Sequence, residues 1–151
     1  MSLNQVANAV GEQLQQYTEN VTTCLEELSE EQVWLPGPDQ SNPIGTLAHH
    51  LSGNLRHFFG AGLSKDGYVR DRLAEFSDRQ LSSKELSENL KEALRVAKEA
   101  LKTMGTPQVE TPHESVDGRE FYSLAHMLLQ MTAHFAYHAG QVNYATRMLR
   151  A

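Results

Sequence analysis

The feature that most restricts the fold is a proline-free stretch from Glu120 to Ala151, in which apolar residues recur at alternating steps of three and four. This spacing puts the apolar side chains on one stripe and predicts a helix from about Glu120 to Leu149. A strict stripe is typical of a helix packed nearly parallel or antiparallel to its neighbours. The stripe comprises Phe121, Leu124, Leu128, Met131, Phe135, His138, Val142, Ala145 and Leu149.

Three further segments show the same apolar period. The first runs from about Leu3 to Leu28, the second spans residues 42–60, and the third runs from about Ser82 to Met104. Ser82 with Glu85 fits the capping box that begins a helix, and Ser29 with Gln32 fits another, which predicts a short turn of helix after the first long one. The sequence thus predicts an all-α fold, a four-helix bundle.

The ends of the second and third helices are marked by proline and glycine. Asn42 is expected to be the N-cap of the second helix, with Pro43 in its first turn, and Gly60 is expected near its end. The long connection that follows, up to Leu81, is unusual in a simple up-down bundle and suits a crossover that lets the second and third helices run parallel. Gly105 and Pro107 are expected to stop the third helix, and residues 106–118 to form a loop.

Composition excludes several classes of protein. A chain of 151 residues with an ordinary apolar share is expected to form one domain, residues 1–151. The net charge of −6 argues against a nucleic-acid partner. The single cysteine, Cys24, rules out an intramolecular disulfide and a cysteine-rich zinc site. No signal peptide or membrane-spanning run is visible, so the expectation is a cytoplasmic protein without a membrane partner.

Histidines on two predicted helices are the strongest indication of chemistry. His134, His138 and Gln141 follow one another at steps of four and three, so they share a helix face. Two imidazoles one turn apart can bind one metal ion, because their Cβ atoms lie about 5–6 Å apart, but such a pair is explained equally well by packing in a helix interface. His50, at the edge of the second helix's apolar stripe, favours the metal site. The neighbouring His49 is less well placed and remains the alternative.

Three stretches carry a family resemblance. The second helix reads N-P-I-G-T-L-A-H-H-L-S-G-N-L, the last helix reads H-F-A-Y-H-A-G-Q-V, and the connection contains D-G-Y-V-R-D-R-L-A-E-F. Together with the four helices, these resemble the DinB-like (YfiT-type) metalloenzyme superfamily, in a branch with His-Leu-Ser-Gly-Asn and His-x-x-x-His-x-Gly-Gln motifs. The resemblance spans most of the chain. It implies an up-down-down-up bundle and a metal site formed by His50, His134 and His138, and some members use a low-molecular-weight thiol.

Three neutral imidazoles would leave a divalent ion with open positions, as in catalytic sites, and zinc, nickel and ferrous iron all suit such ligands. No acidic residue is visibly placed as a general base. The sequence therefore favours a metal-dependent thiol transferase, acting on a small-molecule thiol and an electrophile, over a hydrolase. A non-catalytic metal-binding or interaction bundle is the other class that remains. The substrate is expected between the second and fourth helices and the connection of residues 60–81.

Two polar residues follow the predicted ligands by one turn. Asn54 follows His50, and Gln141 follows His138, so each is on the right face to orient a ligand or hydrogen-bond the site. Simple packing polarity explains them equally well.

A homodimer is also expected, since the last helix carries apolar residues beyond its stripe. Such a face is typical of a surface that binds a partner, and members of the resembling family are often dimers. The residues are Leu129, Ala136 and Tyr144.

Overall fold

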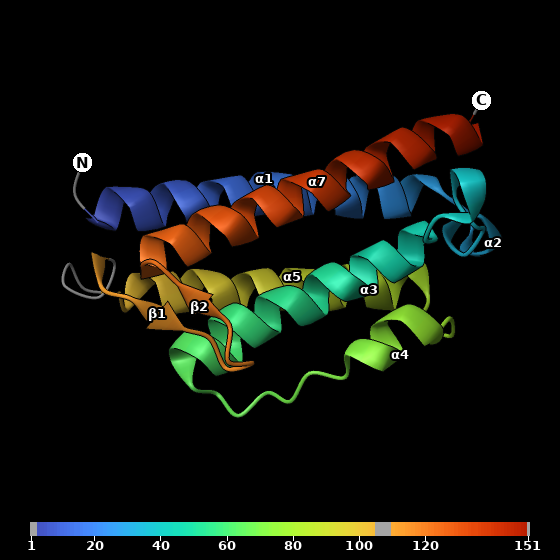
Figure 1. The fold of residues 1–151 in the computed structure, drawn as a ribbon. Coiled ribbons are helices and arrows are strands. Elements are labelled where there is room, and N and C mark those ends of the chain that lie inside the picture. The colour runs from blue at the N-terminus through green and yellow to red at the C-terminus, as the bar shows by residue number, and fades with distance from the viewer. Residues whose placement is uncertain (1–2, 105–109, 151) are drawn as a thin grey trace.

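The computed structural model describes residues 3–104 and 110–150 and shows four long helices packed side by side (Figure 1). They are α1 (Leu3–Glu27), α3 (Ile44–Leu55), α5 (Ser83–Lys102) and α7 (Leu124–Arg150). Helices α1 and α7 run in one direction and α3 and α5 in the other, while α1 and α3 each pack against both α5 and α7. This arrangement confirms the all-α, up-down-down-up four-helix bundle.

Both predicted capping boxes are present. Ser29 and Gln32 exchange backbone-to-side-chain hydrogen bonds of 2.9 and 3.2 Å and begin the short helix α2 (Glu30–Val33). Ser82 and Glu85 exchange equivalent bonds of 2.8 and 3.2 Å at the start of α5. These local signals were readable because each side chain satisfies a backbone N–H group that has no partner within the helix.

The second long helix differs from its prediction at both ends. Its N-cap is Pro43 rather than Asn42, and helical structure continues past Gly60 as the π-helix η2 (Arg56–Ser64). Gly60 does not end the helix. A Cβ there would lie 2.7 Å from Oδ2 of Asp66, so glycine is needed for close packing. The helix ends at Lys65, which adopts a left-handed conformation with φ of 55°.

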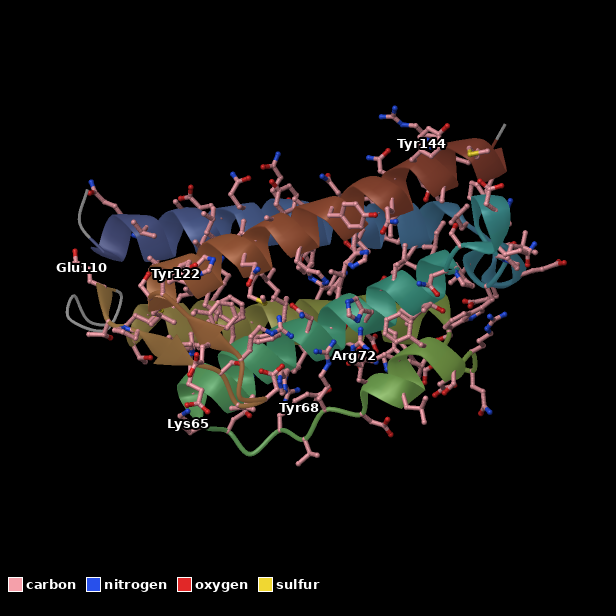
Figure 2. The ribbon with its side chains drawn as sticks, viewed as in Figure 1. Lys65, Tyr68, Arg72, Glu110, Tyr122 and Tyr144 are labelled. Carbon is pink, nitrogen blue, oxygen red and sulfur yellow. The ribbon has the colours of Figure 1, made fainter. Side chains whose placement is uncertain are left out.

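The connection between α3 and α5 is a crossover, as the sequence predicted. It consists of an extended segment, residues 66–71, and the short helix α4 (Arg72–Ser77), which packs on α3. Tyr68 and Arg72 mark these two parts, which lie along the α3 side of the bundle (Figure 2). Asp71 caps α4 by accepting a hydrogen bond of 2.9 Å from the N–H of Ala74.

A small hairpin precedes the last helix. Strands β1 (His113–Glu114) and β2 (Glu120–Phe121) pair antiparallel, so α7 begins at Leu124 and the predicted start at Glu120 was wrong. Phe121 is buried in the hairpin, and its place on the apolar stripe misled the helix prediction because a single apolar residue fits either period. Another short element, the 3-10 helix η1 (Pro38–Gln40), lies between α2 and α3. The expected stop at Gly105 and Pro107 lies outside the described residues.

None of the helices described is both long and apolar enough to cross a lipid bilayer. On the surface of α7, Leu129 and Tyr144 are exposed and Ala136 is partly buried. The homodimer that this face suggested stays a prediction.

Candidate metal centre

Three histidines converge where α3 crosses α7. His50 projects from α3, and His134 and His138 project from successive turns of α7. The Nε2 atom of His134 lies 3.1 Å from Nε2 of His50 and 3.1 Å from Nε2 of His138. Among the described residues, these three form the group of His, Cys, Asp or Glu side chains whose ligand atoms lie within 4.8 Å of one another. We call this group the histidine triad.

Hydrogen bonds to the Nδ1 atoms of two triad histidines orient their Nε2 atoms for binding a metal ion. Nδ1 of His50 lies 2.9 Å from Oε2 of Glu75, and Nδ1 of His138 lies 2.7 Å from Oε1 of Gln141. Both oxygens are acceptors. Nη2 of Arg70 also lies 3.3 Å from Nδ1 of His50, but it makes its shorter hydrogen bond, of 2.8 Å, to Oε2 of Glu75. Each Nδ1 therefore carries the proton, and each Nε2 presents a lone pair to the centre. Metal–nitrogen bonds of about 2.1 Å would separate neighbouring nitrogens by about 3.0–3.4 Å, which agrees with the observed spacing.

His134 completes the fit. Its Nδ1 is buried and has no hydrogen-bond partner among the described residues, while its Nε2 faces two other nitrogens. A single N–H of His134 can donate well to only one of those two lone pairs, which leaves the triad incompletely satisfied by hydrogen bonds alone. A divalent cation accepts all three lone pairs together, and imidazole suits zinc, nickel and ferrous iron.

The protonation states favour the same ligand set. Burial, reinforced by the neighbouring His138 and His50, lowers the pKa of His134 to about 4. Burial also lowers the pKa of His138, although its hydrogen bond to Gln141 opposes that shift. Both imidazoles are therefore neutral at neutral pH, the form in which histidine binds metal.

An ion pair from the crossover, with a buried carboxylate and a partly buried arginine, holds His50. Nε and Nη2 of Arg70 donate to the two oxygens of Glu75 at 2.6 and 2.8 Å, and Oε2 also accepts from His50. The Glu75 side chain is only 2% exposed. Burial alone would raise the pKa of Glu75, but the hydrogen bonds from His50 and Arg70 and the charge of Arg70 hold it below its usual value. Glu75 is thus a carboxylate that fixes the tautomer of His50.

The sequence of α3 leaves space for that carboxylate. A Cβ on Gly53 would overlap the side chain of Glu75, so only glycine at this position lets α4 approach α3 closely. The Phe76 ring, next to Glu75, packs against the His50 ring at 5.0 Å between centroids. Gly53, the glycine of the His-Leu-Ser-Gly-Asn motif, therefore leaves the space that Glu75 needs to reach His50.

The other residues predicted for the site lie as follows. Gln141 contacts the triad directly through His138. Asn54 is buried, and its Oδ1 has no hydrogen-bond partner in the described part of the chain, so its ligand-binding role stays a prediction. His49 is partly buried, and its nitrogens do not join the converging group, so the geometry favours His50 over this alternative.

The remaining histidines lie apart from the triad. His57, on η2, is 3.6 Å from Oδ2 of Asp117 in the hairpin turn. His126 stacks on Tyr122, and its Nδ1 accepts a hydrogen bond of 3.3 Å from the Tyr122 N–H. His113 belongs to β1.

The sequence analysis missed Glu75 and Arg70, and it found no acidic residue placed to act at the site. Their partner on α3 lies 25 residues before Glu75, too far for any helical period to connect them. The available signal was the stretch D-G-Y-V-R-D-R-L-A-E-F, which carried part of the family resemblance and contains both residues.

The fold and the triad place this chain in the class of helical bundles whose metal sites lie between facing helices. The chain belongs to the family described as "Protein of unknown function (DUF1572)", whose model matches residues 3–151. No curated protein matches the chain.

Solved structures share the fold at low sequence identity. YfiT from Bacillus subtilis, described as a probable metal-dependent hydrolase with an unusual four-helix bundle topology, aligns with a TM-score of 0.75 and 16% identity over 95% of this chain and 87% of its own. A DinB-like protein from Bacillus cereus aligns with a TM-score of 0.66 and 19% identity over 88% and 85%. These neighbours confirm the DinB-like, YfiT-type fold that the motifs indicated.

A third structural neighbour is larger. The mycothiol-dependent maleylpyruvate isomerase aligns with a TM-score of 0.68 and 12% identity over 94% of this chain. The chain spans 63% of that protein's length. Sequence identities this low support a shared fold and nothing further.

Proposed function

We propose that the protein binds one divalent metal ion through Nε2 of His50, His134 and His138, and that it uses this ion in thiol-dependent group transfer. The observation that carries the metal proposal is the convergence of three Nε2 atoms, two of them with their lone pairs fixed inward by acceptors behind them. Two helices and a crossover are arranged to produce this convergence.

The protein's own groups have separable tasks in this proposal. Glu75 and Arg70 hold His50, Gln141 holds His138, and burial keeps His134 neutral. When bound, a divalent cation would supply a Lewis acid that favours the ionised form of a thiol or of water at neutral pH.

Thiol transfer is preferred to hydrolysis because the described residues offer no free carboxylate base at the site. Glu75 is the carboxylate in contact with the triad, yet both its oxygens are engaged by Arg70 and His50, and it lies on the Nδ1 side of His50, away from the converging nitrogens. A thiol whose proton is already lost needs no separate base, whereas attack by water usually draws on one. The mycothiol dependence printed for one structural neighbour is consistent with this preference.

A metal-dependent hydrolase is the second candidate, since YfiT is described as a probable one. The experiment is a panel of small thiols with an electrophile such as 1-chloro-2,4-dinitrobenzene, run beside a panel of ester and amide substrates. We expect thiol-dependent product that disappears with a chelator and returns with zinc, nickel or iron. Turnover of esters or amides without thiol would select the hydrolase. Thiol transfer that survives complete removal of metal would refute the proposal.

No turnover in fully metallated protein would favour the non-catalytic metal-binding bundle. His50→Ala and His138→Ala should each abolish thiol-dependent turnover. A suitable control is His126→Ala, because His126 lies in the first turn of α7, stacked on Tyr122 and apart from the triad.

A further inference from the structure

The outer face of α7 has an unusual composition for an exposed helix surface. The helix contains no aspartate, glutamate, lysine or arginine from Leu124 to Thr146. By contrast α5, which also has one side in solvent, carries nine such residues among its 20. Large side chains on α7 are nevertheless exposed, Leu129 by 69%, Tyr137 by 64% and Tyr144 by 65%. An exposed, uncharged and partly aromatic face of this kind is typical of a surface that binds a partner.

Helix α1 extends this uncharged face. It packs beside α7 in one layer of the bundle (Figure 1), and Tyr144 lies on the side of α7 that faces away from α3 (Figure 2). Five exposed residues of α1 follow one another at steps of three and four, and none is charged. They are Ala9, Gln13, Gln16, Asn20 and Thr23.

A cavity of about 370 Å³ joins the two helices on this face. Asn20 lines it from α1, and Gly140 and Tyr144 line it from α7. Arg147, near the end of α7, is the charged residue of its lining. A Cβ on Gly140 would meet no atom within 4 Å, so the surface above the middle of α7 is open. The face can therefore accept side chains from another molecule.

The side chains on this face are arranged symmetrically about the middle of α7. Leu129 and Tyr144 are equally far in sequence from the midpoint between residues 136 and 137. The exposed small residues Ala133 and Gly140 are also equally far from it. When a second α7 lies antiparallel on the first, Leu129 of each copy faces Tyr144 of the other. The small residues then face each other near the centre, where the helices can approach closely. A two-fold interface needs a surface that is complementary to itself in this way.

Charge and area also favour a second copy of this chain as the partner. The chain has a net charge of −6, and charge of one sign opposes self-association, so a face without acidic residues is where two copies meet with least repulsion. A helix of 27 residues is about 40 Å long and two adjacent helices are about 20 Å wide, which gives a face of about 800 Å². Each partner in a stable protein–protein interface buries about that area, roughly 800 Å².

We propose that the face formed by α1 and α7 binds the same face of a second copy, with the two α7 helices antiparallel about a two-fold axis at the midpoint of residues 136 and 137. This dimer is independent of the proposed function, because it uses no nitrogen of the triad. Its test requires neither bound metal nor turnover.

The test is the mass of the full chain in solution, measured by sedimentation equilibrium across the micromolar range. We expect the wild type to have twice the monomer mass of 16.9 kDa. Leu129→Glu should weaken the dimer by at least about 100-fold, because two leucine side chains per dimer are lost and two charges are placed in an apolar contact. The matched control is Leu73→Glu on α4, where the side chain is 80% exposed and lies outside this face. The control should leave the dissociation constant unchanged.

Two double variants test the antiparallel arrangement. In Leu129→Glu/Tyr144→Lys, the new carboxylate of each copy faces the new ammonium of the other, whereas Leu129→Glu/Tyr144→Glu brings like charges together. At low salt the first should dimerise at least about tenfold more tightly than the second, because the contact occurs twice per dimer, and added salt should reduce the difference. Circular dichroism should show native helix content in every variant, because the substituted side chains are exposed.

Three results would overturn the proposal or part of it. A wild type that stays monomeric at the highest concentration it tolerates would refute the dimer. Equal weakening in Leu129→Glu and Leu73→Glu would show that this face is not the interface. Equal affinities of the two double variants would refute the antiparallel arrangement.

Discussion

The two halves of the triad are held in different ways. On the α3 side, His50 is fixed by the charged and buried Glu75, which comes from another element and is itself paired with Arg70. On the α7 side, His138 is fixed by the neutral Gln141 from the next turn of the same helix. His134, between them, has no hydrogen-bond partner on its Nδ1 within residues 3–104 and 110–150. The α3 side therefore depends on tertiary structure and the α7 side on local helix geometry. Substitutions on the two sides should differ in their effects on stability and metal affinity.

The largest effect is expected on the α3 side from Glu75→Ala. The substitution leaves Arg70 buried without its partner and frees the tautomer of His50, so it should cost about 3–5 kcal/mol of unfolding free energy and roughly 10- to 100-fold in metal affinity. Urea unfolding and competition with a chelator measure the two. Glu99→Ala, which removes an exposed carboxylate paired with Lys102 on α5, is the control and should change neither. Wild-type metal affinity in Glu75→Ala would contradict the positioning role.

Gly53→Ala tests the same half without removing any polar group. The new methyl would overlap the Glu75 carboxylate and displace it from His50, so metal affinity should fall by roughly tenfold and the melting temperature should drop. Gly140→Ala is the matched control, since a Cβ there meets no atom within 4 Å. That control should stabilise α7 by about 0.5–1 kcal/mol, because alanine favours a helix over glycine. Equal stabilisation in both variants would show that Gly53 is not needed to make room for the Glu75 carboxylate.

Gln141→Ala, on the α7 side, should have the smaller effect on metal affinity. The hydrogen bond it removes is neutral and partly exposed, and water can replace it, so we expect a loss of about tenfold or less with no drop in stability comparable to Glu75→Ala. The same chelator competition measures it. A loss larger than that in Glu75→Ala would reverse the comparison between the two halves.

The smallest effect is expected from pH. In metal-free protein, His134 and Glu75 should affect the unfolding free energy in different pH ranges. The pKa of His134 is lower in the fold, about 4, than its ordinary 6.5, so the unfolded chain binds the proton more readily and stability falls as pH drops from 6.5 towards 4. The pKa of Glu75 is held below its ordinary 4.5, so its contribution is complete above 4.5 and is lost only in more acidic solution. Unfolding free energies from pH 7.5 to 3.5 measure both. His134→Gln should reduce the pH dependence in the upper window without abolishing it, because the pKa of His138 is also lowered by burial, and it should leave the lower window unchanged. An unchanged profile would refute the assignment.

The sequence predicted what local geometry determines. The four helices, both capping boxes and the shared face of His134, His138 and Gln141 follow from spacings of three and four residues. The parts that it missed depend on contacts between distant segments. Glu75 reaches His50 from the crossover, and Phe121 pairs in a hairpin although its spacing continues the stripe of α7. A period can place a side chain on a face, but it cannot show which other element covers that face.

The most direct test of the central claim is the metal content of purified wild-type protein and of His134→Ala, measured by elemental analysis after dialysis. The triad should hold about one divalent ion per chain in the wild type, since its three imidazoles form a single donor set. In His134→Ala most of the metal should be lost while the helical circular dichroism and the melting temperature of the metal-free protein are retained, because the imidazole removed has no partner on Nδ1 to leave unsatisfied. Full metal retention in a folded His134→Ala protein, or a wild type that takes up no divalent ion, would contradict the account.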